Sequence, residues 1–122
     1  MKILILGAGR VGSSLASTLS KQEYEVSIVD LNKDKLLRLQ EDYDLATEIG
    51  HASHPNTLER AGADQDTVLL AVTNSDECNI TSCQIAKSKF NVKKTICRLS
   101  DASYLESLEA FGEKNIDIAI GP

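Results

Sequence analysis

Three glycines near the amino terminus have the spacing of a phosphate-binding turn, in the stretch ILILGAGRVGSSLA. Gly7, Gly9 and Gly12 form a G-x-G-x-x-G pattern between a short apolar run and a stretch of helical periodicity. In such a crossover the first glycine permits a tight turn, the second lets a pyrophosphate approach the backbone, and the third lets the helix pack on the strand. The pattern therefore predicts a nucleotide cradle, with Arg10 as a candidate phosphate ligand.

An acidic residue at the end of the next apolar segment makes this prediction more specific. Asp30 follows Gly12 by 18 residues and closes the segment EVSIVD. A carboxylate at this place accepts hydrogen bonds from the ribose hydroxyls of adenosine. Because it repels a 2′-phosphate, we expect NAD(H) to be preferred over NADP(H). ATP and ADP share the ribose hydroxyls and a pyrophosphate, so the pattern leaves them open.

Three further strand ends carry polar residues that could meet the same ligand, because such folds bind ligands outside the carboxyl ends of their strands. The sequence GHAS follows the third predicted strand, on the adenine side, and TNSD follows the fourth, near the distal half of a dinucleotide. Arg98 ends the fifth and could meet a phosphate or a carboxylate of another subunit. Asn74 and Ser75 could equally cap the following helix. The candidate binding residues are Gly7, Ala8, Gly9, Arg10, Val11, Gly12, Asp30, Leu31, His51, Ser53, Thr73, Asn74 and Arg98.

The elements that must position these residues alternate between apolar strands and helical stretches. We predict strands at Lys2–Leu6, Glu25–Asp30, Leu45–Ile49, Thr67–Val72, Lys94–Arg98 and Ile116–Ile120. We predict helices at Arg10–Lys21, from a cap at Asn32 to about Asp42, at Pro55–Ala61, from Asp76 to about Lys89, and at Asp101–Phe111. This alternation predicts an α/β Rossmann-type fold. It would be a doubly wound, six-stranded parallel sheet in the order 3-2-1-4-5-6, with helices on both faces.

Composition limits the classes of protein that the chain could belong to. Its 122 residues, 42% hydrophobic and 25% charged, suit a single globular domain over 1–122. A net charge of -5 without a basic run argues against a nucleic-acid partner. We expect neither a secretory signal nor insertion into a membrane. The three cysteines suit a reducing cytosol and are expected to act as small buried hydrophobic residues. The end of the chain, directly after the last strand, suggests a fragment of a longer protein.

The sequence contains no motif that indicates catalysis. We find no G-x-S-x-G elbow, no H-E-x-x-H pair and no P-loop lysine. Asp76 and Glu77 are interpreted as partners of a helix dipole. His51 and His54 are expected on a loop without a third ligand, so no metal site is predicted. Because a chain of this length leaves no room for a substrate domain, we expect a nucleotide that is read rather than consumed.

Five segments together resemble one family much more specifically than the glycine pattern does. They are MKILILGAGRVG, SIVDLN, GHASHPNTLERAGADQ, AVTNSDECNI and ICR, and the resemblance extends over essentially the whole chain. The sequence resembles the nucleotide-binding domain type called TrkA-N, KTN or RCK, found at the amino end of TrkA in bacterial Trk potassium uptake. The resemblance implies a cytoplasmic domain that binds NAD(H) or adenine nucleotides. Such a domain assembles as a dimer or ring beneath a membrane potassium-translocating subunit and regulates ion flux.

The resemblance also implies roles for particular residues. It places the phosphates at the loop from Gly7 to Val11, the adenosine ribose at Asp30, and the distal half at Thr73 and Asn74. Arg98 would face the phosphates or a partner subunit. The sequence departs from the family pattern at His51. Many family members carry Asp at this place, directly after the glycine that ends the third strand.

Two other classes share parts of the pattern. The cofactor domain of an NAD-dependent oxidoreductase would have the same glycines and Asp30, with a substrate domain downstream. An S-adenosylmethionine methyltransferase also uses glycines and an acid at the end of the second strand. It is a more distant alternative, because such folds usually carry elements before the first strand, whereas the first strand predicted here begins at Lys2.

Overall fold

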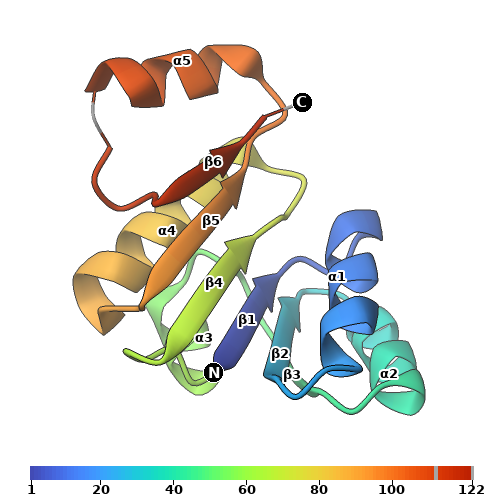
Figure 1. Cartoon of the computed structure of the whole chain (residues 1–122). Helices are drawn as coiled ribbons and strands as arrows, with labels where there is room; N and C mark the ends of the chain where they lie inside the picture. The colour runs from blue at the N-terminus through green and yellow to red at the C-terminus, as the bar shows by residue number, and fades with distance from the viewer. Residues whose placement is uncertain (112, 122) are drawn as a thin grey trace.

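The computed structural model describes residues 1–111 and 113–121 and has strands and helices in strict alternation (Figure 1). The strands are β1 (Lys2–Leu6), β2 (Glu25–Asp30), β3 (Ala46–Ile49), β4 (Thr67–Ala71), β5 (Lys94–Arg98) and β6 (Ile118–Ile120). The helices are α1 (Arg10–Ser20), α2 (Lys33–Asp42), α3 (Pro55–Arg60), α4 (Asp76–Phe90) and α5 (Ala102–Phe111). They form the predicted α/β class of fold.

All neighbouring strands run parallel, in the order β3-β2-β1-β4-β5-β6. The two central strands are buried on both faces. In β1, Leu4, Ile5 and Leu6 are at most 2% exposed, as a continuous apolar strand requires when helices cover both sides. The order reverses between β1 and β4, which puts a crevice between the carboxyl ends of these two strands. The predicted topology is confirmed.

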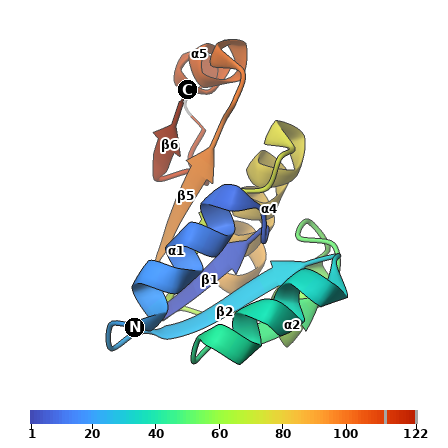
Figure 2. The ribbon, with the colours of Figure 1, turned by 90° about the vertical axis from the view of Figure 1, so that its right-hand side faces the viewer.

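Two layers of helices cover the sheet. The α1 and α2 layer packs on a core that includes Ile3, Ile5 and Ile28, and α3 and α4 pack on the opposite face around Leu4, Leu6 and Leu69. Figure 2 shows α1 and α2 in front of β1 and β2, with α4 behind the sheet. Both layers deliver helix amino ends to the same edge of the sheet.

Element bounds differ from the predicted ones by a few residues at most. The largest difference is at β6, which begins at Ile118 rather than Ile116. The residues before it are held by hydrogen bonds to Thr95, from the Asp117 side chain and the Asn115 carbonyl as acceptors. Helix α2 begins where predicted, since the Asn32 side chain accepts a hydrogen bond from the Lys35 N–H at 3.1 Å.

The glycine loop joins β1 to α1 as the sequence predicts. Gly7 has a φ of +106°, a conformation that L side chains rarely adopt. A Cβ on Gly12 would lie 1.7 Å from the Gly7 carbonyl oxygen, so only glycine permits this approach of helix to strand. A Cβ on Gly9 would meet no atom within 4 Å, which leaves the space over its backbone open.

Candidate nucleotide-binding site

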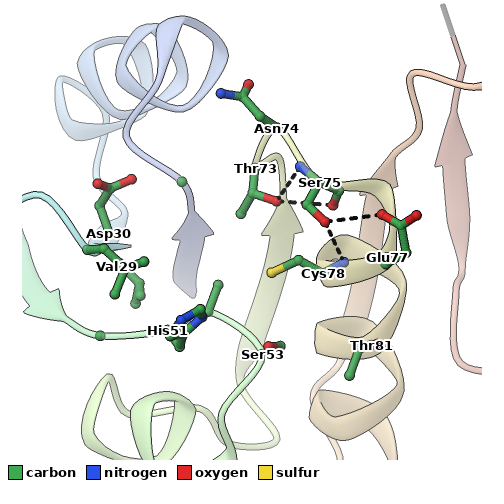
Figure 3. Close-up of a pocket in the computed structure, with 14 residues that line it drawn as sticks. Val29, Asp30, His51, Ser53, Thr73, Asn74, Ser75, Glu77, Cys78 and Thr81 are labelled. Atoms are coloured by element: carbon green, nitrogen blue, oxygen red, sulfur yellow. Dashed lines mark hydrogen bonds between the residues drawn. The ribbon is translucent and has the colours of Figure 1, made fainter.

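A cavity of about 500 Å³ lies outside the carboxyl ends of β1, β2, β3 and β4. In Figure 3, Asp30 and His51 lie on one side of it and the residues from Thr73 to Thr81 on the other. A second cavity of about 310 Å³ adjoins it and extends over the glycine loop toward Arg98. The two share Gly7, Asp30, Thr73 and Asn74 in their linings. These shared residues show that the two cavities adjoin each other.

Asp30 is held between the two cavities by the backbone on either side. One carboxylate oxygen accepts from the Ala8 N–H and the other from the Asn32 N–H, each at 2.8 Å. A carboxylate has about four acceptor positions, so each oxygen can accept a further hydrogen bond. The carboxylate is therefore fixed in orientation and can still receive two hydroxyl groups.

The amino end of α1 has no side-chain partner for its first N–H groups. Gly9 is its N-cap and provides no side chain, and its first turn carries no acidic residue. Helix α4, by contrast, has Ser75 as a capping side chain and two acids in its first turn. The unpaired N–H groups and positive dipole end of α1 thus face the second cavity.

Cationic side chains surround the same helix start. Arg10, Lys35 and Arg98 line the second cavity, and none of them forms an ion pair with another of the described residues. Three cations against the single carboxylate of Asp30 give this cavity an excess of positive charge, in a chain with a net charge of -5. The second cavity is therefore suited to an anionic group, and the first cavity to the less polar part of a ligand.

One of the two histidines lies in the lining of the first cavity. His51 lines it, and its ring stacks on the ring of His54 with centroids 4.9 Å apart. Both are on the loop between β3 and α3, as expected. Ser53 lines the same cavity, and Leu31 contributes a side chain that is 61% exposed.

A hydrogen-bonded turn follows β4. The Thr73 hydroxyl accepts from the Ser75 N–H at 3.2 Å, and the Ser75 hydroxyl accepts from the Cys78 N–H at 3.1 Å. Ser75 is thus the cap of α4, one of the two roles that the sequence left open for it. Asn74 lines both cavities and is exposed between them.

The structure brings together all but one of the predicted site residues. Twelve of them line one or more of three adjoining cavities, the third of which has a volume of about 320 Å³ and includes Ala8. Gly12 lines none of them and acts through packing alone.

Residues of α4 in the first cavity were missed by the sequence reasoning. Glu77, Cys78 and Thr81 line it, whereas the sequence predicts a helix-dipole role for Glu77 and a core position for Cys78. The expectation of a buried side chain is wrong for Cys78, which is only half-buried. It is right for Cys83 and Cys97, which are buried. The start of α4 lies over the cavity, so Glu77, Cys78 and Thr81, at positions i, i+1 and i+4, share a face toward it. Such spacing occurs on every helix, so the sequence carries no signal that this face lies over the cavity.

The pKa of one carboxylate in this lining, that of Glu77, is lowered by a side chain of a neighbouring helix. The Tyr104 hydroxyl of α5 donates to Glu77 at 2.6 Å, which lowers the pKa of Glu77 and raises the pKa of Tyr104. Glu77 is therefore an anion at neutral pH.

Among residues 1–111 and 113–121, no group of three or more His, Cys, Asp or Glu is placed to hold a metal ion. No helix in the same ranges combines the length and apolar character needed to cross a membrane.

The parallel sheet, the glycine loop and the acid at the end of β2 define the chain as a Rossmann-type α/β domain of the dinucleotide-binding class. Within that class, the TrkA-N domain family matches residues 3–122. The chain belongs to this family. It is 45% identical over 125 residues to the Trk system potassium uptake protein TrkA of Vibrio alginolyticus, covering all of this chain and 27% of that protein. The chain thus spans about a quarter of the length of that relative.

Solved structures show the same fold at low sequence identity. The TrkA-N domain of the inner membrane protein ybaL from Escherichia coli has a TM-score of 0.84 and 16% identity, over 98% of this chain and 86% of that one. A GsuK channel bound to NAD has a TM-score of 0.75 and 19% identity, over 98% of this chain and 21% of that one.

Proposed function

We propose that this domain binds NAD(H) across the two adjoining cavities and serves as a nucleotide sensor for potassium uptake. The adenosine half lies in the first cavity, with its ribose hydroxyls on Asp30. The pyrophosphate lies over Gly9 and the amino end of α1, near Arg10. The distal half extends toward Thr73, Asn74 and Arg98.

The observation that carries this proposal is the placement of Asp30. Its two oxygens are oriented by the Ala8 and Asn32 N–H groups, on the border between an electropositive cavity and a larger one. A diol on this carboxylate puts the 5′-phosphate of the same nucleoside toward the glycine loop. The solved GsuK channel of the same fold, which holds NAD, supports this choice of ligand.

ATP and ADP present the same adenosine and two of the same phosphates. We therefore include them as ligands of the same site. A competition between NADH and ATP is then expected, because both occupy Asp30 and the glycine loop.

The regulatory role rests on the relatives. The TrkA proteins are named for a Trk potassium-uptake system. By analogy the nucleotide would be a signal and not a reactant, and the domain would not be an enzyme. It would act at the cytoplasmic face of the membrane, bound to a potassium-translocating subunit and associated with itself as a dimer or ring. A nucleotide changes the activity of such an assembly only by binding its two states with different affinity.

Calorimetric titration with NADH, NAD, ATP and ADP tests the binding step. We expect saturable binding of at least one of them, and competition whenever two bind. Mass spectrometry of nucleotide retained by the purified protein identifies the ligand preferred in the cell. Absence of binding by all four would overturn the proposal.

A further inference from the structure

A buried amide lies behind the distal part of the candidate site. Asn79 of α4 is fully buried, and its side chain makes four hydrogen bonds. Its oxygen accepts from the Thr73 N–H at 3.0 Å and from the Thr73 hydroxyl at 2.6 Å. Its NH₂ group donates to the Thr73 carbonyl at 3.1 Å and to the Arg98 carbonyl at 2.8 Å. One side chain therefore satisfies the backbone of two different strand ends.

The sheet itself does not hold these two ends together. The register between β4 and β5 ends with the pair Ala71 and Cys97. Thr73 lies two residues beyond that pair, and Arg98 is paired with Ile120 on the other side. Beyond the last residue pair of β4 and β5, the hydrogen bonds of Asn79 therefore connect the two strand ends.

Asn79 belongs to a row of three buried polar side chains on α4, spaced three residues apart. Asp76 accepts from the Ser100 and Asp101 N–H groups, at 2.8 and 2.9 Å. Ser82 donates to the Ala52 carbonyl at 3.1 Å. Burying such groups is favourable only when each is hydrogen-bonded. Each member of the row therefore specifies the place of a different loop, and the loops held by Asn79 and Ser82 both line the candidate site.

We propose that Asn79 is the positioning residue for the distal half of the nucleotide site. It sets Thr73 and Arg98 relative to each other, so that they meet the distal phosphate and ribose of a dinucleotide together. Ser82 has the corresponding place behind the adenine side, through Ala52. This inference rests on the function proposed above.

The test compares NADH, which reaches both halves of the site, with 5′-AMP, which reaches the adenosine half. Asn79→Asp keeps the shape and the two accepted hydrogen bonds but removes both donors, and sets a carboxylate against the carbonyls of Thr73 and Arg98. Asn79→Ser is the milder variant, too short to reach both strand ends. Ser82→Ala is the matched control, because it removes a buried hydrogen bond of the same helix on the adenine side.

We expect both Asn79 variants to weaken NADH about tenfold or more while 5′-AMP changes by less than about twofold. Ser82→Ala should weaken both ligands by the same factor. The ratio of the two dissociation constants decides the matter, because loss of folded protein affects both ligands equally and leaves their ratio unchanged.

If both Asn79 variants weaken NADH and 5′-AMP by equal factors, or change neither, Asn79 has only a structural role and the inference fails. Failure of the wild-type protein to bind either ligand is a different result, because it overturns the proposed function together with this inference.

Discussion

Arg10 is the charged side chain inside the glycine loop, and it has no partner among the described ion pairs. It lines the second and third cavities at the start of α1. A guanidinium there can bond two phosphate oxygens at once. Its contribution should therefore depend on the phosphates of the ligand.

We expect Arg10→Ala to weaken ADP binding about tenfold and adenosine binding hardly at all. Calorimetry with the two ligands measures the difference. Lys33→Ala removes an exposed positive charge from the start of α2, outside the described cavities, and should leave both affinities unchanged. Equal losses for adenosine and ADP in Arg10→Ala would refute a phosphate contact.

Cys78 offers a direct reporter of the first cavity. Its half-buried thiol lines the cavity, whereas Cys83 and Cys97 are buried. An alkylating reagent should therefore modify Cys78 first in the folded protein, and saturating NADH should slow that reaction about fivefold or more, as bound ligand excludes the reagent. Mass spectrometry of peptides from a time course measures the rate.

The fast-reacting thiol should be absent in Cys78→Ser, which confirms its assignment. Alkylation of Cys78 at an unchanged rate, under conditions in which calorimetry shows the site to be saturated, would place the ligand elsewhere.

Helix α1 comes closest to the chain leaving β1 at Gly12. A Cβ on Gly12 would lie 1.7 Å from the Gly7 oxygen and 3.5 Å from the Ile5 side chain. Because the obstruction is backbone, the helix must move away from the strand. We expect Gly12→Ala to lower the free energy of unfolding by about 2 kcal/mol or more, measured by urea denaturation.

Gly9→Ala is the control for this helix start, since its Cβ would meet nothing within 4 Å. Its stability should stay close to wild type, while its nucleotide affinity falls because the added methyl group occupies the space over the loop. If Gly12→Ala were as stable as Gly9→Ala, the close packing of α1 would be wrong.

Asp117, directly before β6, forms an ion pair with Lys87 of α4 and accepts a hydrogen bond from Thr95 of β5. Burial pushes the pKa of Asp117 upward, but the Lys87 ammonium at 2.9 Å and the Thr95 N–H outweigh this and leave the pKa below its ordinary value. A lowered folded-state pKa stabilises the protein above the unfolded pKa, which is about 4. This contribution is lost as the pH falls through the lower pKa of the folded state.

Asp117→Asn should therefore destabilise the protein at pH 6 and have a smaller effect at pH 3. Urea midpoints at the two pH values measure the change. An equal loss at both pH values would show that the charge of Asp117 contributes nothing.

The elements were predictable from the sequence because their signals are local. Continuous apolar runs identify the buried strands, and Asn32 identifies the start of α2 by its own hydrogen bond. The beginning of β6 was not predictable, because Asp117 and Asn115 bond across the chain to Thr95. Asn79 was missed for the same reason, since its partners are Thr73 and, 19 residues away, the Arg98 carbonyl.

At the scale of the whole molecule, the parallel topology gathers distant residues at one edge. The strand order places the end of β2 beside the glycine loop and the end of β4 opposite, so Asp30 and Thr73 meet across a cavity despite their separation in sequence. The general rule for such sheets predicted this gathering. It could not predict that α4 would present Cys78 and Glu77 to the same cavity, because that depends on how the helix turns over the sheet.

At the same scale, helix α4 connects several loops around the candidate site. Helix α4 contacts the loops after β3, β4 and β5 through Ser82, Asn79 and Asp76. Tyr104 joins it to α5 through Glu77, which lines the first cavity. Hydrogen bonds of α4 therefore connect the lining of the first cavity with the β5 and α5 part of the domain.

The central claim is that Asp30 receives the adenosine ribose of a bound nucleotide. The measurement that tests it most directly is calorimetric titration of NADH into the wild type, Asp30→Asn and the matched control Asp44→Asn, which changes an exposed acid outside the described cavities. Loss of hydrogen bonds to a charged acceptor should weaken NADH about tenfold or more in Asp30→Asn and leave Asp44→Asn like the wild type. Equal affinity of all three proteins for NADH would contradict the account.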